Sequence, residues 1–311
     1  QFRSSMADVS SMSIKELKAL IAEAGLSIDG CIEKADLRTR AAEAQAKLAQ
    51  QVGNGRATSA PVASRTLGRY KCVVVAPDEV LAGHAPADLA VILLHGLGAG
   101  SNDLANLATS LPGLTRKILF VCPQAPPHPM FGSAWWTIDP MKFLALSTAD
   151  EATVASAIRE EPPDLGTCRK QMADLLADVR QLGGGAEGML PASRVVLGGF
   201  SQGAITSLDV ALQCAPEERL AGVLFLSGAP LVVEQWAALL KNHRGLRVLM
   251  AHGLADPTLP VKASKWVLDL LEQGGADVIY KQHAGGHDIG DQAVIAAIVK
   301  FVNESGLSEV C

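Results

Sequence analysis

The sequence predicts an α/β fold in which a mostly parallel β-sheet is covered by helices on both faces. Two observations lead to this prediction. Several short runs rich in Val, Ile and Leu are apolar throughout, which is typical of strands buried on both faces of a sheet. Helix-length stretches alternate with these runs along the chain. In such a sheet we expect the functional residues at the carboxyl ends of the strands.

The composition indicates a globular chain with a large core. The 311 residues are 49% hydrophobic and 19% charged, which is far from the composition of disordered proteins. The formal net charge of −5 argues against a chain-wide electrostatic attraction to nucleic acid or to anionic lipid. No apolar run approaches the ~20 residues of a membrane span, so we expect no transmembrane segment.

A small helical module is predicted at residues 1–52. Ser13 and Glu16 form a capping box, and apolar residues such as Leu17 and Ile21 then recur at helical spacing. The Ala-rich stretch 32–51, with Leu37, Ala41, Ala44 and Leu48 on one face, predicts a second helix and completes a hairpin. Residues 53–67 are rich in Gly, Ser, Ala, Thr and Pro and are interpreted as a flexible linker.

The α/β domain is predicted at residues 68–311. The strand-like runs are 70–75, 89–94, 118–122, 194–197, 222–226, 247–251 and 278–282. The helical stretches are 168–182, 204–214, 233–240, 263–273 and 292–303.

The strongest chemical motif is a serine in a glycine-rich turn. Residues 198–203 read Gly-Gly-Phe-Ser-Gln-Gly, and they contain G-x-S-x-G between a predicted strand and a predicted helix. A nucleophilic serine at such a sharp turn needs very small neighbours, which the glycines provide. Ser201 is therefore the candidate nucleophile, and an incidental serine in a glycine-rich turn is the alternative.

A serine nucleophile needs a histidine base that is oriented by an acid, and on this fold the chain order is serine, acid, histidine. Asp256 and His287 each follow a late predicted strand and satisfy this order. His283 and His287 have the spacing of a metal pair, but the glycines between them oppose the helix that such a pair needs, so we expect no metal. His252 is expected to shape the Asp256 loop.

The tetrahedral intermediate requires two backbone N–H donors. One is expected from Gln202, directly after the nucleophile, and the other from Leu97 in the glycine-rich loop 95–100 after an early strand. Nucleotide binding is the alternative for this loop, but its glycine spacing does not match G-x-G-x-x-G and no P-loop lysine follows.

These motifs carry a family resemblance. His-Gly-Leu-Gly at 95–98, Cys-Pro-Gln-Ala-Pro at 122–126, the serine motif, the segment 252–256 and Gly286-His287 together resemble the acyl-protein thioesterase/carboxylesterase (phospholipase/carboxylesterase) family of α/β-hydrolases. The resemblance covers about residues 89–302. It implies a serine hydrolase of acyl esters or thioesters, acting on small-molecule or lipid substrates through an acyl-enzyme without metal or cofactor. A catalytically inactive binding protein and a hydrolase specific for acyl-proteins or lysophospholipids are the alternatives.

An aromatic insert is the candidate acyl pocket. Where the family has a short segment around Trp-Phe-Asp, this chain has Ala-Trp-Trp-Thr-Ile-Asp at 134–139 and then a longer insert to about residue 165. Met130, Phe131, Trp135 and Trp136 follow an early strand, which places them near the carboxyl edge of the sheet. Ordinary core packing is the alternative for these residues.

The remaining predictions concern partners and compartment. The N-terminal hairpin is similar to SAP-like modules, some of which bind DNA. Residues 14–51 carry six basic and six acidic side chains, so a protein-docking or merely accessory module is favoured over nucleic-acid binding. Six scattered cysteines without a CxxC pair indicate reduced thiols and a cytoplasmic location. The chain opens at Gln1, which is compatible with a removed targeting segment.

Overall fold

The computed structural model describes residues 61–138 and 156–307, together with residues 17, 18, 21, 36–41 and 44. The chain divides into two units, Gln1–Ser59 and Ala60–Cys311. In the first unit the described residues are helical. Of the apolar positions on which the hairpin prediction relies, those that the structure describes are buried, namely Leu17, Ile21, Leu37, Ala41 and Ala44. The rest of the predicted hairpin, with its proposed partner surface, lies outside the described residues.

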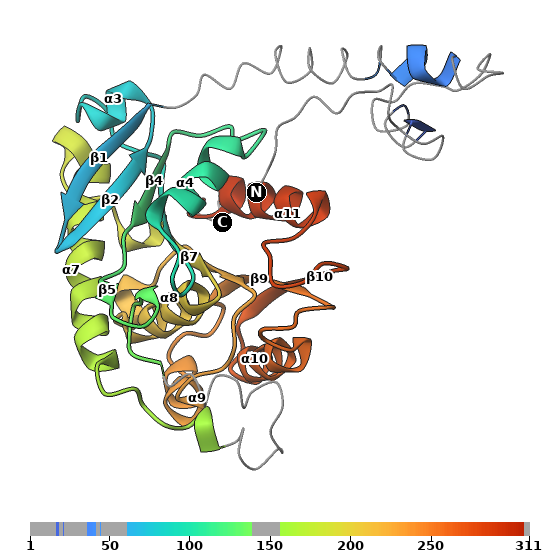
Figure 1. Cartoon of the computed structure of the whole chain (residues 1–311). Coiled ribbons are helices and arrows are strands. Elements are labelled where there is room, and N and C mark those ends of the chain that lie inside the picture. Colours follow the sequence, from blue (N-terminus) through green and yellow to red (C-terminus); the bar gives the residue numbers. More distant parts are fainter. Residues whose placement is uncertain are drawn as a thin grey trace. The chain divides into compact units, whose positions relative to one another are not determined.

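The second unit is built on an eight-stranded sheet with the order β1-β2-β4-β3-β7-β8-β9-β10 (Figure 1). Strands β4, β3, β7, β8, β9 and β10 pair in parallel in that order, and β1 and β2 add an antiparallel edge. The bounds are β1 Val62–Leu67, β2 Tyr70–Val75, β3 Leu89–Leu94, β4 Ile118–Pro123, β7 Val195–Phe200, β8 Gly222–Leu226, β9 Arg247–Gly253 and β10 Asp277–His283. The predicted α/β class and all seven predicted strands are confirmed.

The linker prediction is wrong at its C-terminal end. Val62–Leu67 forms β1 and pairs with β2 in the register Val62↔Val75 to Leu67↔Tyr70. The sequence pattern did not predict this strand because five of its six residues are exposed or half-buried, so it shows no hydrophobic run. Its backbone pairs on one side only, as expected for an edge strand.

Helices cover both faces of the sheet. One face carries α7 (Leu165–Gly184), α8 (Gln202–Gln213), α9 (Val233–Leu240) and α10 (Val261–Gln273), and the other carries α4 (Ser101–Ser110) and α11 (Gln292–Glu304). Strand β3 shows how the cores are separated, because Ala90, Ile92 and Leu94 pack in the first core and Leu89, Val91 and Leu93 in the second. Of these helices, α4 was not predicted.

Short elements complete the unit. A one-turn helix, α3 (Asp78–Leu81), follows β2, and β5 (Pro127–His128) with β6 (Gly132–Ser133) forms a small hairpin after β4. Short 3₁₀ turns span Gly185–Glu187, Ala192–Arg194 and Pro216–Glu218.

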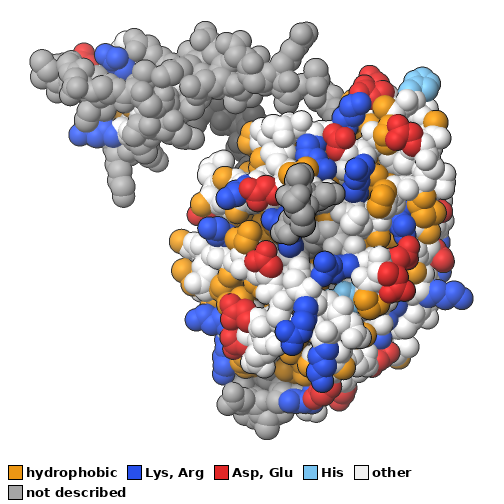
Figure 2. All heavy atoms as spheres, turned by 180° about the vertical axis from the view of Figure 1, so that it is seen from behind, with side chains coloured by type: hydrophobic (Ala, Val, Ile, Leu, Met, Phe, Trp, Pro, Cys, Tyr) orange, Lys and Arg blue, Asp and Glu red, His pale blue; other side chains and the backbone are white. Residues whose placement is uncertain are grey.

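Acidic and basic side chains intermingle on the face shown in Figure 2. Among the described residues no helix is long and apolar enough to cross a membrane. The cytoplasmic location stays a prediction.

Candidate active site

Ser201 sits at the turn between β7 and α8. Its φ angle of 55° lies in the left-handed region, which is strained for a residue other than glycine and recurs at functional sites. The Ser201 N–H donates to the carbonyl of Leu226 on the neighbouring strand and so fixes the turn. A Cβ at Gly199 or Gly203 would lie 2.4 or 1.9 Å from the carbonyl oxygen of Leu94, so both positions require glycine. The spacing of the motif is therefore a steric necessity of this turn.

The three predicted polar residues form one hydrogen-bonded chain. Ser201 Oγ lies 3.0 Å from His287 Nε2, and His287 Nδ1 lies 2.7 Å from Asp256 Oδ2. Asp256 follows β9 and His287 follows β10, so the parallel sheet brings both loops to the edge at which β7 ends. Ser201 and Asp256 are buried, whereas the His287 side chain is 18% exposed. The geometry is that of a nucleophile, a base and an orienting acid.

The Asp256 carboxylate is held from two further directions. Its Oδ1 accepts the backbone N–H groups of Thr258 and Leu259, both at 2.8 Å. Buried His252 lies 3.4 Å from Oδ2 through its Nε2, and the same nitrogen is 2.9 Å from the carbonyl oxygen of Leu259. Burial lowers the pKa of His252 and so favours its neutral form. The expectation that His252 shapes the Asp256 loop agrees with these contacts.

Two further polar residues lie close to His287 in the sequence, His283 and Asp288, and they contact each other and their own loop. His283 is buried, and its Nδ1 accepts the N–H of Gly285 and lies 3.5 Å from Asp288 Oδ1. The other carboxylate oxygen of Asp288 accepts the N–H of Gly286. Asp288 therefore faces His283 and its own loop, while Asp256 faces His287.

The glycine-rich loop after β3 lies against the serine. A Cβ on Gly96 would be 3.4 Å from Ser201 Cβ, so the backbone that leads into Leu97 passes close to the nucleophile. Among the described residues, none accepts a hydrogen bond from the Leu97 N–H. Gln202 is the first residue of α8, where the backbone N–H has no acceptor within the helix. In the part of the chain that the structure describes, the backbone N–H groups of both expected oxyanion donors therefore have no backbone acceptor and are available to a substrate.

His95 holds this loop in place and was missed by the sequence analysis. Its Nε2 accepts the N–H of Ala125 at 3.0 Å, which leaves the proton on Nδ1, 2.8 Å from the carbonyl oxygen of Gly96. Burial lowers its pKa and favours this neutral form. A histidine directly after an apolar strand and before a glycine-rich loop was the available signal.

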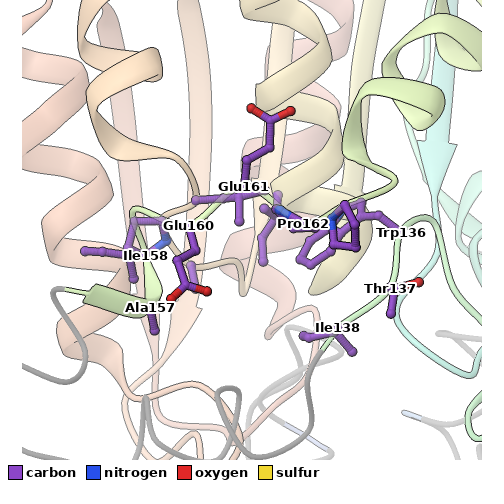
Figure 3. A pocket seen from close by; sticks show the side chains of 13 residues that line it. Trp136, Thr137, Ile138, Ala157, Ile158, Glu160, Glu161 and Pro162 are labelled. Carbon is purple, nitrogen blue, oxygen red and sulfur yellow. The ribbon is translucent and has the colours of Figure 1, made fainter.

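A pocket of about 320 Å³ lies next to the nucleophile helix (Figure 3). Ile205, one helical turn after Ser201, contributes to its lining, and Trp136, Thr137 and Ile138 lie on one side of it. The lining is completed by Ala157, Ile158, Glu160, Glu161, Pro162, Pro163, Ala229, Pro230 and Leu231. Most of these residues are apolar, with Thr137, Glu160 and Glu161 as the exceptions, so the pocket suits a hydrocarbon chain.

The predicted acyl-pocket residues have different positions. Trp136 lines the pocket, while Trp135 packs its ring against Tyr70 and His95. Phe131 stacks on His128, and Met130 is 70% exposed. Residues 139–155 of the insert lie outside the described residues.

Another residue that the sequence analysis missed tethers the His287 loop. Buried Ser227, at the end of β8, donates its hydroxyl to the carbonyl of Asp288 at 2.9 Å. Its φ of 50° is again in the left-handed region. Nothing in the local sequence pattern distinguishes this serine.

Comparison with known proteins agrees with the geometry. The model of the phospholipase/carboxylesterase family matches residues 76–305. Acyl-protein thioesterase 1 of Neurospora crassa is 29% identical over 203 residues, which cover 63% of this chain and 79% of that protein. Acyl-protein thioesterase 1 of Gibberella zeae is 30% identical over 210 residues, covering 63% and 82%.

Solved structures share the fold. Esterase PE8 superposes with a TM-score of 0.58 at 25% identity and covers 79% of this chain and 98% of its own. Acyl-protein thioesterase 2 of Zea mays superposes with a TM-score of 0.52 at 21% identity, covering 74% and 96%. At that identity the maize protein supports the fold alone.

Proposed function

Because this chain belongs to the phospholipase/carboxylesterase family, whose members are serine hydrolases of acyl esters or thioesters, we propose that Ser201, His287 and Asp256 carry out its chemistry. The observation that supports this assignment is the continuous chain of contacts from Ser201 Oγ through His287 to Asp256 Oδ2, at 3.0 and 2.7 Å. The alternative of an inactive binding protein has no support from the relatives, which are thioesterases and esterases.

Acylation begins with proton transfer. His287 Nε2 takes the Ser201 proton while Oγ attacks the acyl carbonyl carbon and forms the tetrahedral intermediate. Asp256 accepts from His287 Nδ1, keeps Nε2 free of a proton in the resting enzyme and stabilises the imidazolium that forms. The imidazolium then gives its proton to the leaving oxygen or sulfur, and the acyl group stays on Ser201. Water, activated by the same histidine, releases the carboxylic acid and restores the serine.

The negative charge of the intermediate develops on the former carbonyl oxygen. The N–H groups of Leu97 and Gln202 are the proposed donors to it. Both donors are held before substrate arrives, since His95 bonds to Gly96, directly before Leu97, and to Ala125 after β4, and Gln202 is the first residue of α8. Such preorganised donors require little rearrangement during the reaction.

We place the acyl chain in the pocket lined by Trp136 and Ile205. Its volume of about 320 Å³ and its largely apolar lining suit an acyl chain of medium length. Each buried methylene contributes ~0.8 kcal/mol, or about a fourfold gain in kcat/KM. Activity should therefore rise steeply up to medium-chain esters and then level off.

The test is kcat/KM across p-nitrophenyl esters of graded chain length. Ile205→Trp, which fills the pocket, should shift the preferred length to shorter chains, and Trp136→Ala, which enlarges it, to longer ones. Trp266→Ala is the matched control, because Trp266 lies on α10 outside the pocket lining and contacts Lys262. If the pocket variants keep the wild-type length profile, the acyl chain binds elsewhere.

The leaving group calls for a separate comparison. Oxygen and sulfur esters pass through the same tetrahedral geometry. Acyl-CoA, an S-acylated peptide and a lysophospholipid of equal chain length should be compared with the p-nitrophenyl ester. Preference for the S-acylated peptide would support the acyl-protein hydrolase that the fungal relatives' names suggest.

A further inference from the structure

The side chain of Gln202 has contacts that its proposed backbone role does not require. It is 2% exposed, and its amide makes two bonds to the same segment of the aromatic insert. Oε1 accepts the N–H of Trp135 at 3.1 Å, and Nε2 donates to the carbonyl oxygen of Trp136 at 2.8 Å. Because a backbone N–H can only donate and a carbonyl can only accept, these partners determine the orientation of the amide.

The two tryptophan rings connect the same segment to both proposed oxyanion donors. The Trp136 indole N–H donates to Thr206 Oγ1 at 3.0 Å, and this hydroxyl donates to the carbonyl of Gln202 at 2.8 Å. The Trp135 indole N–H donates to the carbonyl of His95 at 2.7 Å, two residues before Leu97. The pocket wall at Trp136 is thus bonded to the start of α8 and, through Trp135, to the glycine-rich loop.

This connection has a consequence for catalysis. Binding energy from an acyl chain accelerates the reaction only if the bound chain places its carbonyl correctly in the transition state. A displacement of about 1 Å between pocket and oxyanion donors can cost roughly 100-fold in rate. A pocket wall that is bonded to the donor residue itself keeps this distance constant.

We propose that the Gln202 side chain is a specificity-determining residue that holds the acyl pocket in register with the oxyanion hole. This inference rests on the proposed function. Its two amide bonds allow a chain that fills the pocket to raise kcat/KM. A short acyl group, which does not reach Trp136, gains little from them.

Gln202→Glu provides a test that can be switched with pH. The protonated carboxyl has the shape of the amide, with an O–H that can donate to the Trp136 carbonyl and an oxygen that can accept from the Trp135 N–H. The ionised carboxylate has no donor for the Trp136 carbonyl. The measurement is the ratio of kcat/KM for the octanoate and acetate p-nitrophenyl esters, followed from about pH 5 to about pH 8.

The ratio isolates the effect of the amide bonds. Any pH effect that changes both rates by the same factor cancels in the ratio. Burial lowers the pKa of His95 and so favours its neutral form. The wild-type ratio should be constant, whereas the Gln202→Glu ratio should be near wild type at acidic pH and fall about tenfold or more as the carboxyl ionises.

Two further variants complete the experiment. Gln202→Met fills the same space without the amide and should give a low ratio at every pH. Gln171→Glu is the matched control, because Gln171 lies on α7, where its Oε1 accepts the Tyr70 hydroxyl, and it should give the wild-type ratio at every pH. A Gln202→Met ratio equal to wild type, or a Gln202→Glu ratio that does not change with pH, would overturn the inference. A wild-type ratio near one would instead refute the proposed pocket.

Discussion

Replacement of Asp256 by asparagine tests the assigned acid with a change of one atom. In the structure, Asp256 Oδ1 accepts two backbone N–H groups, while Oδ2 accepts from His287 Nδ1. The asparagine must place its oxygen where the two backbone donors are, since an NH₂ group cannot accept. Its NH₂ group then faces His287 and donates to Nδ1.

This forced orientation selects the unproductive tautomer of His287. With Nδ1 acting as acceptor, the ring proton sits on Nε2, which lies 3.0 Å from Ser201 Oγ and can no longer take the serine proton. The negative charge that stabilises the imidazolium is also lost. We expect kcat/KM to fall by about 10³- to 10⁴-fold, which corresponds to about 4 to 5.5 kcal/mol of transition-state stabilisation.

Folding should suffer much less than catalysis. The two backbone bonds to Oδ1 survive in Asp256→Asn, so the free energy of unfolding should fall by only about 1–2 kcal/mol. Asp256→Ala removes these bonds as well and should cost about 1 kcal/mol more for each. Thermal unfolding and p-nitrophenyl ester hydrolysis, measured on the same samples, separate the two effects.

Asp288→Asn is the matched control. The Asp288 side chain faces Gly286 and His283, and it should tolerate the same one-atom change with little loss of rate. A near-wild-type rate for Asp256→Asn, or a loss in Asp288→Asn as large as that expected for Asp256→Asn, would refute the assignment of Asp256 as the orienting acid.

Three further predictions follow from the same contacts. Ser201→Ala and His287→Ala should each lower kcat by about 10⁴-fold or more, and the double variant should lose little beyond either single one; multiplicative losses would contradict a cooperative triad. Removal of residues 1–59 should leave hydrolysis of a small soluble ester unchanged, because the triad and the eight-stranded sheet lie within Ala60–Cys311. Loss of activity in a folded truncated protein would contradict this prediction and assign the N-terminal unit a role at the active site. Burial lowers the pKa of His95, His243 and His252 below the ordinary ~6.5, so the unfolded chain binds protons that the folded chain excludes. The free energy of unfolding should therefore fall below about pH 6.5 by up to about 1.4 kcal/mol per pH unit for each histidine. Thermal melts should show this slope and a shallower one in His243→Gln, and an unchanged melting temperature down to about pH 5 would contradict it.

The strands and the nucleophile could be predicted because their signals are local. The central parallel strands give continuous apolar runs because their side chains are buried on both faces, as in β3 and β8. Strands β2 and β10 are less buried, but their runs are still rich in β-branched residues. The serine motif is equally local, because Gly199 and Gly203 are required by the same backbone turn that presents Ser201. Strand β1 lacked such a signal because it is an exposed edge.

The difference between the two tryptophans could not be predicted from the sequence. Trp135 and Trp136 are adjacent and equally buried, yet one ring packs on His95 and the other lines the pocket. Which ring points where depends on acceptors at His95 and Thr206, which come from other elements. The sequence analysis assigned both residues to the acyl pocket, because the sequence shows which aromatic residues the insert contains but not which partner each ring contacts.

The sequence by itself determined the α/β class, the order of the strands along the chain and the chemical types and spacing of the candidate triad. These features depend on hydrophobic periodicity and backbone sterics, which act between residues a few positions apart. Only the tertiary structure decided that His95 and Ser227 hold the active-site loops and that the Gln202 amide bonds to residues 66 and 67 positions away. Hydrogen-bond partners at such separations are set by which loops the sheet brings to one edge, and that arrangement arises only when the whole core has packed.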